Sequence, residues 1–146
     1  MSIEDRLADL GIDLPPVAKP VAAYVPAIQV GDQISTSGQL PLVSGSLPMT
    51  GLVGDQISQG DAAGQARVAA LNALAAAADV AGGVNNIRRV VRVVVYVAST
   101  ADFTAQPAVA NGASELFGEI FGDAGRHIRS AVSYTHLRAH ETRGNL

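Results

Sequence analysis

The residues best suited to hold a small molecule lie near the C-terminal end of the chain, in the run Arg-His-Ile-Arg-Ser at positions 126–130. Arg129 carries a planar guanidinium, which pairs with a carboxylate through two parallel hydrogen bonds. If this run forms a strand beside a cleft, Arg129 can grip an anionic substrate there. Alternatively, Arg129 is an exposed strand residue or forms a salt bridge with Glu115 or Asp123. Spacing alone leaves these interpretations open.

Nucleophilic chemistry finds little support in the sequence. The chain has no cysteine, which excludes a thiol nucleophile, thiolate metal ligands and disulfides. Ser130 follows His127 by three residues, but strand alternation would place the two on opposite faces. No paired carboxylates stand out, and no glycine-rich run has the spacing or strand–helix context of a phosphate-binding or dinucleotide-binding loop. We therefore expect neither a cofactor nor a metal.

A pair of histidines near the end of the chain has the spacing of zinc ligands. His136 and His140 are four residues apart, but Leu137 stands where a metalloprotease would have its glutamate. The composition also changes near Val132, and the stretch 133–142 resembles a translated reading frame of a sequencing adapter. We expect 132–146 to be a non-native tail, so the histidine pair predicts no metal site.

The composition limits the class of protein and its partners. The chain has 146 residues, 48% of them hydrophobic and 16% charged, which suits one folded domain. Its net charge is −3, and only Arg88, Arg89 and Arg92 cluster, so binding to nucleic acid has little electrostatic support. No apolar run is long enough for a membrane helix, and no signal peptide is visible. These features predict a soluble cytoplasmic protein without membrane or nucleic-acid partners.

Three helices are expected from capping residues and apolar spacing. A short helix over 3–10 has acidic residues in its first turn, where they are favourable. A longer helix begins at Ser58 or Asp61 and ends at Gly82-Gly83, with an apolar stripe at helical spacing. The third helix is expected over about 106–121. The two longer helices would each pack one face against a sheet.

The strands are expected between and before these helices. Residues 24–30 and 33–37 flank Gly31-Asp32 and read as a hairpin, while the valine-rich run 87–98 is typical of a central strand. A further strand begins at about 126–132. The order predicts an α+β fold with a mixed sheet and two helices packed on one face. An uncovered sheet face and a core of small side chains indicate that the protein oligomerises.

Four motifs resemble, in order, signatures of the reactive intermediate deaminase (Rid/YjgF) family. They are Ile-Ser-Thr-Ser-Gly-Gln-Leu-Pro at 34–41, Gln-Ala-Arg at 65–67 with Leu71-Asn72, Val-Val-Tyr-Val at 94–97 with Asp102-Phe103, Asn111, Glu115 and Phe117 after it, and Arg-Ser-Ala-Val at 129–132. The resemblance implies a Rid/YjgF-like domain over 20–131, preceded by an N-terminal helix and a proline-rich connector over 1–19. These additions suggest a divergent YjgF-like subgroup, named for endoribonuclease activity.

The resemblance implies a chorismate-mutase-like α+β fold, assembled as a homotrimer with clefts between subunits. It also implies hydrolysis of reactive imines and enamines, such as 2-aminoacrylate, to a 2-keto acid and ammonia. The family residues that line the cleft match Arg129 as the carboxylate-binding arginine, Tyr24, Ser37, Gly38, Asn111, and Ala131, whose backbone would help to place the water. Tyr24 and Asn111 could equally be structural, Tyr24 in the core and Asn111 within its helix.

Departures from the family pattern keep a second function open. The family's final strand, with its candidate acidic proton donor, is expected after the arginine strand and is missing here, so we expect this form of the chain to be impaired. The leading interpretation is an imine and enamine deaminase. The alternative is a non-enzymatic trimeric protein that binds a small molecule or a partner. RNA cleavage fits poorly with an acidic chain whose single lysine is Lys19.

Overall fold

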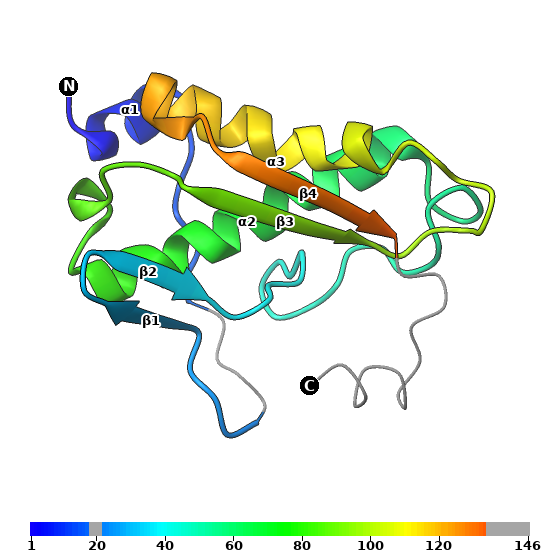
Figure 1. Ribbon diagram of the computed structural model, residues 1–146, viewed down its shortest axis with the longest axis horizontal. Coiled ribbons are helices and arrows are strands. Elements are labelled where there is room, and N and C mark those ends of the chain that lie inside the picture. The colour runs from blue at the N-terminus through cyan, green and yellow to red at the C-terminus, as the bar shows by residue number, and fades with distance from the viewer. Residues whose placement is uncertain (18–21, 134–146) are drawn as a thin grey trace.

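The computed structural model describes residues 1–17 and 22–133 (Figure 1). Its elements, in chain order, are α1 (Ile3–Asp9), β1 (Ala27–Val30), β2 (Gln33–Thr36), α2 (Gln59–Ala81), the 3-10 helix Val84–Asn86, β3 (Arg92–Val97), α3 (Gln106–Phe121), the 3-10 helix Gly122–Gly125 and β4 (Ile128–Ser133). The fold is α+β, as predicted. None of the helices in the described ranges is long and apolar enough to cross a membrane.

The helix boundaries follow from capping side chains. Ser2 and Asp5 form a reciprocal capping box at the start of α1. Ser58 caps α2, because its hydroxyl oxygen accepts a hydrogen bond from the Asp61 backbone N–H at 3.1 Å. Gly82 ends α2 in the left-handed region, with φ of 83°, a conformation that glycine adopts without steric cost. The predicted start and end of this helix are confirmed.

The strands form two separate ladders. β1 and β2 are an antiparallel hairpin in which Val30 pairs with Gln33. β3 and β4 are parallel, and α3 connects them, as parallel strands require a crossover. No backbone ladder joins the two pairs within the described part of the chain. Figure 1 shows the four strands on one side of the molecule with α2 and α3 behind them.

The valine-rich segment differs from its prediction. Only its second half is a strand, because the Val90 N–H donates to the Ala124 carbonyl and so joins this segment to the turn after α3. β3 is also not buried on both faces, since Arg92 and Tyr96 are exposed. The reason is that the helices pack against one face of β3, through Val93 and Val95, and Arg92 and Tyr96 lie on the other face.

The core lies where α2 and α3 touch each other. Leu116 and Ile120 of α3 are almost completely buried against small alanines of α2. The two backbones approach closely at Gly112, where an added Cβ would collide with the Ala63 carbonyl oxygen. Small residues therefore let the two helices pack closely, and large side chains are not needed to fill the space between them.

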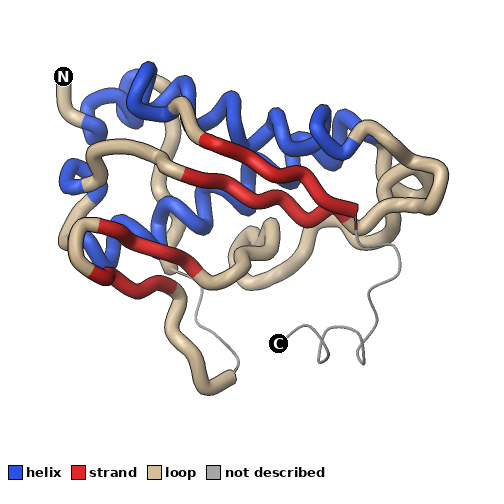
Figure 2. The backbone as a smooth tube through the Cα atoms, in the orientation of Figure 1, coloured by secondary structure: helices blue, strands red, loops and turns tan. Residues whose placement is uncertain are grey.

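The opposite face of the strands is apolar and exposed. Ile128, Ser130 and Val132 of β4 point away from the helices. They pair with Arg92, Val94 and Tyr96 of β3, which lie on the same face. Exposed apolar side chains on this face are Ile28, Val30, Tyr96, Ile128 and Val132. Figure 2 shows the strand surface lying in front of the helices that cover its other side. We refer to these five residues as the open face.

Candidate functional site

Arg129 lies on the helix-facing side of β4. It pairs with Val93 of β3, whose side chain packs against the main core, so both side chains point toward the helices. The adjacent Ile128 points to the open face instead. Because β4 is at the edge of its ladder, the long Arg129 side chain can pass the edge and reach α3.

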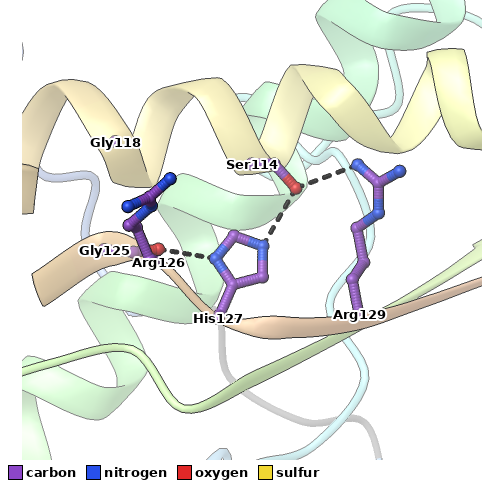
Figure 3. A pocket seen from close by; sticks show the side chains of 6 residues that line it. All are labelled: Ser114, Gly118, Gly125, Arg126, His127 and Arg129. Carbon is purple, nitrogen blue, oxygen red and sulfur yellow. Dashed lines mark hydrogen bonds between the residues drawn. The ribbon is translucent and has the colours of Figure 1, made fainter. Parts of the chain in front are cut away.

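The guanidinium of Arg129 is held by two side chains of α3, of which Figure 3 shows Ser114. Its Nη1 donates to Asn111 Oδ1 at 2.7 Å and to Ser114 Oγ at 3.2 Å. Asn111 and Ser114 are three residues apart, so they share one face of the helix. These two bonds use both hydrogens of Nη1. Among the described residues, the edge formed by Nη2 and Nε therefore remains for a ligand, and this fork matches a carboxylate.

The salt bridges considered for Arg129 do not form. In residues 1–17 and 22–133, the ion pair is the one between Arg67 and Glu119, whose Nη1 and Oε2 atoms are 2.6 Å apart. Neither Glu115 nor Asp123 pairs with Arg129. This favours the interpretation of Arg129 as an anion-binding residue over its interpretation as a salt-bridge residue.

A hollow of about 290 Å³ lies beside this arginine. Its lining residues are Ser114, Gly118, Gly125, Arg126, His127 and Arg129 (Figure 3). Of the residues that the structure describes, two arginines and no carboxylate line it, so its electrostatic potential favours an anion. Gly118 leaves open space on the helix side, because a Cβ added there would meet no atom within 4 Å.

His127 belongs to this site, although we expected no chemistry from it. Its Nε2 lies 2.9 Å from Ser114 Oγ, and its Nδ1 lies 2.6 Å from the Gly125 carbonyl oxygen. The ring also packs edge-on against Phe117, with centroids 6.0 Å apart. The sequence offers Ser130, its near neighbour, as a serine for His127, but on the opposite face of the strand. The serine that His127 contacts, Ser114, comes from α3. Its helical spacing from Asn111 indicates that the two share a helix face, but no sequence signal indicates the contact with His127.

Tyr24, Ser37 and Gly38 lie at the hairpin and do not line the Arg129 hollow. The Ser37 hydroxyl donates to the Val25 carbonyl at 2.6 Å, and the Ser37 N–H donates to the Pro26 carbonyl at 2.8 Å. These two bonds hold the segment just after Tyr24 against the end of the hairpin. Tyr24 itself is 51% exposed. Within one chain, the expected site residues thus fall into two groups, one at the hairpin and one between β4 and α3.

Two further residues belong to the motifs found in the sequence. Ala131 lies two positions after Arg129, on the same side of β4, and is half-buried. Asn72 of α2 is buried, and its Nδ2 donates to the carbonyls of Leu40 at 2.9 Å and Leu42 at 3.1 Å. This asparagine fixes the segment that follows Gly38, which gives a structural reason for the asparagine in its motif.

The expectation that the protein has no metal site concerns two parts of the chain. Over residues 1–17 and 22–133, no group of three or more histidine and carboxylate side chains could hold a metal ion. His136 and His140 lie outside the described residues, as does most of the expected tail. Val132 and Ser133, which we assigned to the tail, are part of β4.

Two solved structures share this fold. A Shewanella oneidensis MR-1 protein, described as a putative endoribonuclease, has a TM-score of 0.89 and 33% identity, with 94% of this chain and 91% of that chain covered. An Agrobacterium tumefaciens protein of unknown function has a TM-score of 0.83 and 40% identity, with 94% and 85% covered.

Sequence comparisons agree with the structural ones. Protein TCP17 of Trypanosoma cruzi is 39% identical over 133 residues, which cover 90% of this chain and 83% of that protein. The family model described as "YjgF/chorismate mutase-like, putative endoribonuclease" matches residues 4–137. The predicted chorismate-mutase-like fold is thereby confirmed, and the chain belongs to the YjgF/chorismate mutase-like family.

Proposed function

We propose that the protein is a 2-imino acid and enamine deaminase, which hydrolyses small substrates such as 2-aminoacrylate. The observation that carries the proposal is the unoccupied Nη2 and Nε edge of Arg129, held by Asn111 beside a hollow without carboxylates. A carboxylate of a small substrate fits such a fork. The volume of about 290 Å³ suits a compact ligand better than a large one.

The chemistry needs positioning more than a strong nucleophile. The enamine 2-aminoacrylate tautomerises to 2-iminopropanoate, water adds to the imine carbon, and the resulting carbinolamine loses ammonia to give pyruvate. One water is consumed, one ammonia is released, and no atom is oxidised or reduced. Arg129 would hold the carboxylate so that the imine carbon has a fixed orientation, which is a large part of such a rate gain. Backbone groups at Ala131 would help to place the water.

The arrangement of the chain supports an assembly with shared sites. Tyr24 and Ser37 lie away from the Arg129 hollow in one chain, while the open face exposes Ile28, Val30 and Ile128. We propose a homotrimer in which one subunit presents its hairpin residues to the Arg129 group of its neighbour. Burial of the open face would stabilise that assembly.

The decisive experiment compares two arginine substitutions. Arg129→Ala should abolish the acceleration, above the spontaneous rate, with which 2-aminoacrylate generated in the cuvette by a serine dehydratase is converted to ammonia and pyruvate. Arg88→Ala is the matched control, because Arg88 is exposed and does not line the hollow, and it should leave turnover unchanged. Unchanged turnover in Arg129→Ala would refute the assignment. Saturable binding of pyruvate without ammonia release would favour the non-enzymatic alternative.

RNA cleavage is the second candidate, because the matching family and the Shewanella protein carry endoribonuclease in their descriptions. Arg126 and Arg129 at the hollow could contact a phosphate. The same purified protein can be incubated with a labelled single-stranded RNA at physiological salt. Cleavage that disappears in Arg129→Ala and persists in Arg88→Ala would favour this function over deamination.

A further inference from the structure

The hydrogen bonds around Ser114 have one consistent direction. A carbonyl only accepts, so the Gly125 carbonyl requires a proton on His127 Nδ1; in the tautomer that carries its single proton there, Nε2 is an acceptor. A guanidinium only donates, so Ser114 Oγ accepts from Arg129. The hydroxyl hydrogen of Ser114 must then point to His127 Nε2. The chain of donors runs from Arg129 through Ser114 and His127 to Gly125.

We propose that Ser114 and His127 are positioning residues, which hold Arg129 so that its free edge faces the hollow. This role rests on the proposed binding of a small carboxylate by Arg129. A serine inside a helix otherwise tends to donate to the carbonyl four residues earlier. His127 offers a competing acceptor, which directs the hydroxyl hydrogen away from Arg129 and leaves an oxygen lone pair for Nη1.

The far end of this chain is anchored in the core. An added Cβ at Gly125 would collide with the Phe117 carbonyl oxygen, so the turn before β4 lies directly on α3. Phe117 is buried and its ring contacts His127. His127 is therefore fixed by its ring contact and by the Gly125 carbonyl, and it transmits that position to Ser114 and Arg129. Ordering an exposed arginine before the ligand arrives lowers the entropic cost of binding.

A serine beside a histidine also suggests a nucleophile, but the surroundings of Ser114 argue against that role. Ser114 lies in the middle of α3, between Gln106 and Phe121, where backbone N–H groups are bonded within the helix. An acyl-transfer site would need free N–H donors near the nucleophile to stabilise an oxyanion. Ser114 accepts from Arg129 instead, which suits an orienting contact.

The test measures carboxylate binding separately from turnover. Ser114→Ala and His127→Phe remove the chain of hydrogen bonds, and phenylalanine keeps a ring against Phe117. Each should weaken pyruvate binding in an NMR titration by about tenfold, the expected loss for one to two net hydrogen bonds. KM for 2-aminoacrylate should rise similarly, while kcat should fall much less than in Arg129→Ala, because Arg129 is still present to hold the carboxylate. Ser114→Thr keeps the hydroxyl and should restore binding.

Two controls separate positioning from folding. Ser130→Ala removes a hydroxyl from the other side of β4 and should leave pyruvate binding unchanged. The ring ¹⁵N shifts of His127 should show the Nδ1–H tautomer in the unmodified protein, and the Nε2 shift should move in Ser114→Ala. Pyruvate binding that Ser114→Ala leaves unchanged, or that the unmodified protein lacks, would overturn the proposal. Pyruvate binding without any turnover would refute the deaminase function alone.

Discussion

At the scale of single residues, Arg129 and Asn111 carry the site. The sequence identified both through a family resemblance, but it could not give the distance between them. That distance depends on how far α3 lies from β4, and Nη1 meets Oδ1 at 2.7 Å only because both face the same gap. Asn111 was open to a structural or a functional interpretation. Its contact with Arg129 favours the functional one, and a charge change can test it.

Asn111→Asp should keep the acceptor for Arg129 and add a negative charge beside the anion site. The fold should be retained, since Asn111 is exposed, while KM for 2-aminoacrylate and the dissociation constant for pyruvate should each rise by about tenfold. Because exposed charges are screened by salt, the effect should shrink as sodium chloride is raised from low to high concentration. A lower Tm with unchanged pyruvate binding would show that Asn111 has a structural role instead.

At the scale of elements, the sequence predicted where the helices lie along the chain, but not which elements contact one another. Local signals located α2 and α3, because caps such as Ser58 and stops such as Gly82 act within one turn. The strand pairing of β3, by contrast, depends on residues 36 positions later along the chain, as in the pair Arg92 and Ile128. For the same reason the Ser114–His127 contact was missed, since the two residues come from different elements. Periodicity carries no information on which elements meet.

The contact between α2 and α3 gives a sharp stability prediction. Gly112→Ala should lower the free energy of unfolding by about 1–3 kcal/mol, because the new Cβ overlaps the Ala63 carbonyl and the helices must separate. Gly118→Ala on the same helix is the matched control, since its Cβ would meet open space. Alanine favours a helix over glycine by up to about 1 kcal/mol, so this change should stabilise. Urea denaturation curves with equal loss in both variants would contradict the prediction.

At the scale of the whole molecule, the two groups of site residues and the open face have a common explanation. One chain separates Tyr24 and Ser37 from the Arg129 hollow, and it leaves Ile128 67% exposed on the opposite side of the strand that carries Arg129. Contact between copies of the chain would bury that face and can bring the two groups together. Assembly and catalysis should therefore be lost together when the open face is made polar.

Ile128→Asp tests this coupling. The unmodified protein should have the mass of three chains by light scattering, while the variant should shift to one chain, because a buried carboxylate without a partner is strongly unfavourable. Turnover of 2-aminoacrylate should fall with the mass, although Ile128 points away from the Arg129 hollow. Val80→Asp, a similar change on an exposed position of α2, should alter neither. If the variant stays trimeric, the open face is not the subunit interface. If the unmodified protein is a stable monomer with full turnover, the hairpin residues of a neighbouring subunit are not part of the site. The Arg129 group would then act within a single chain.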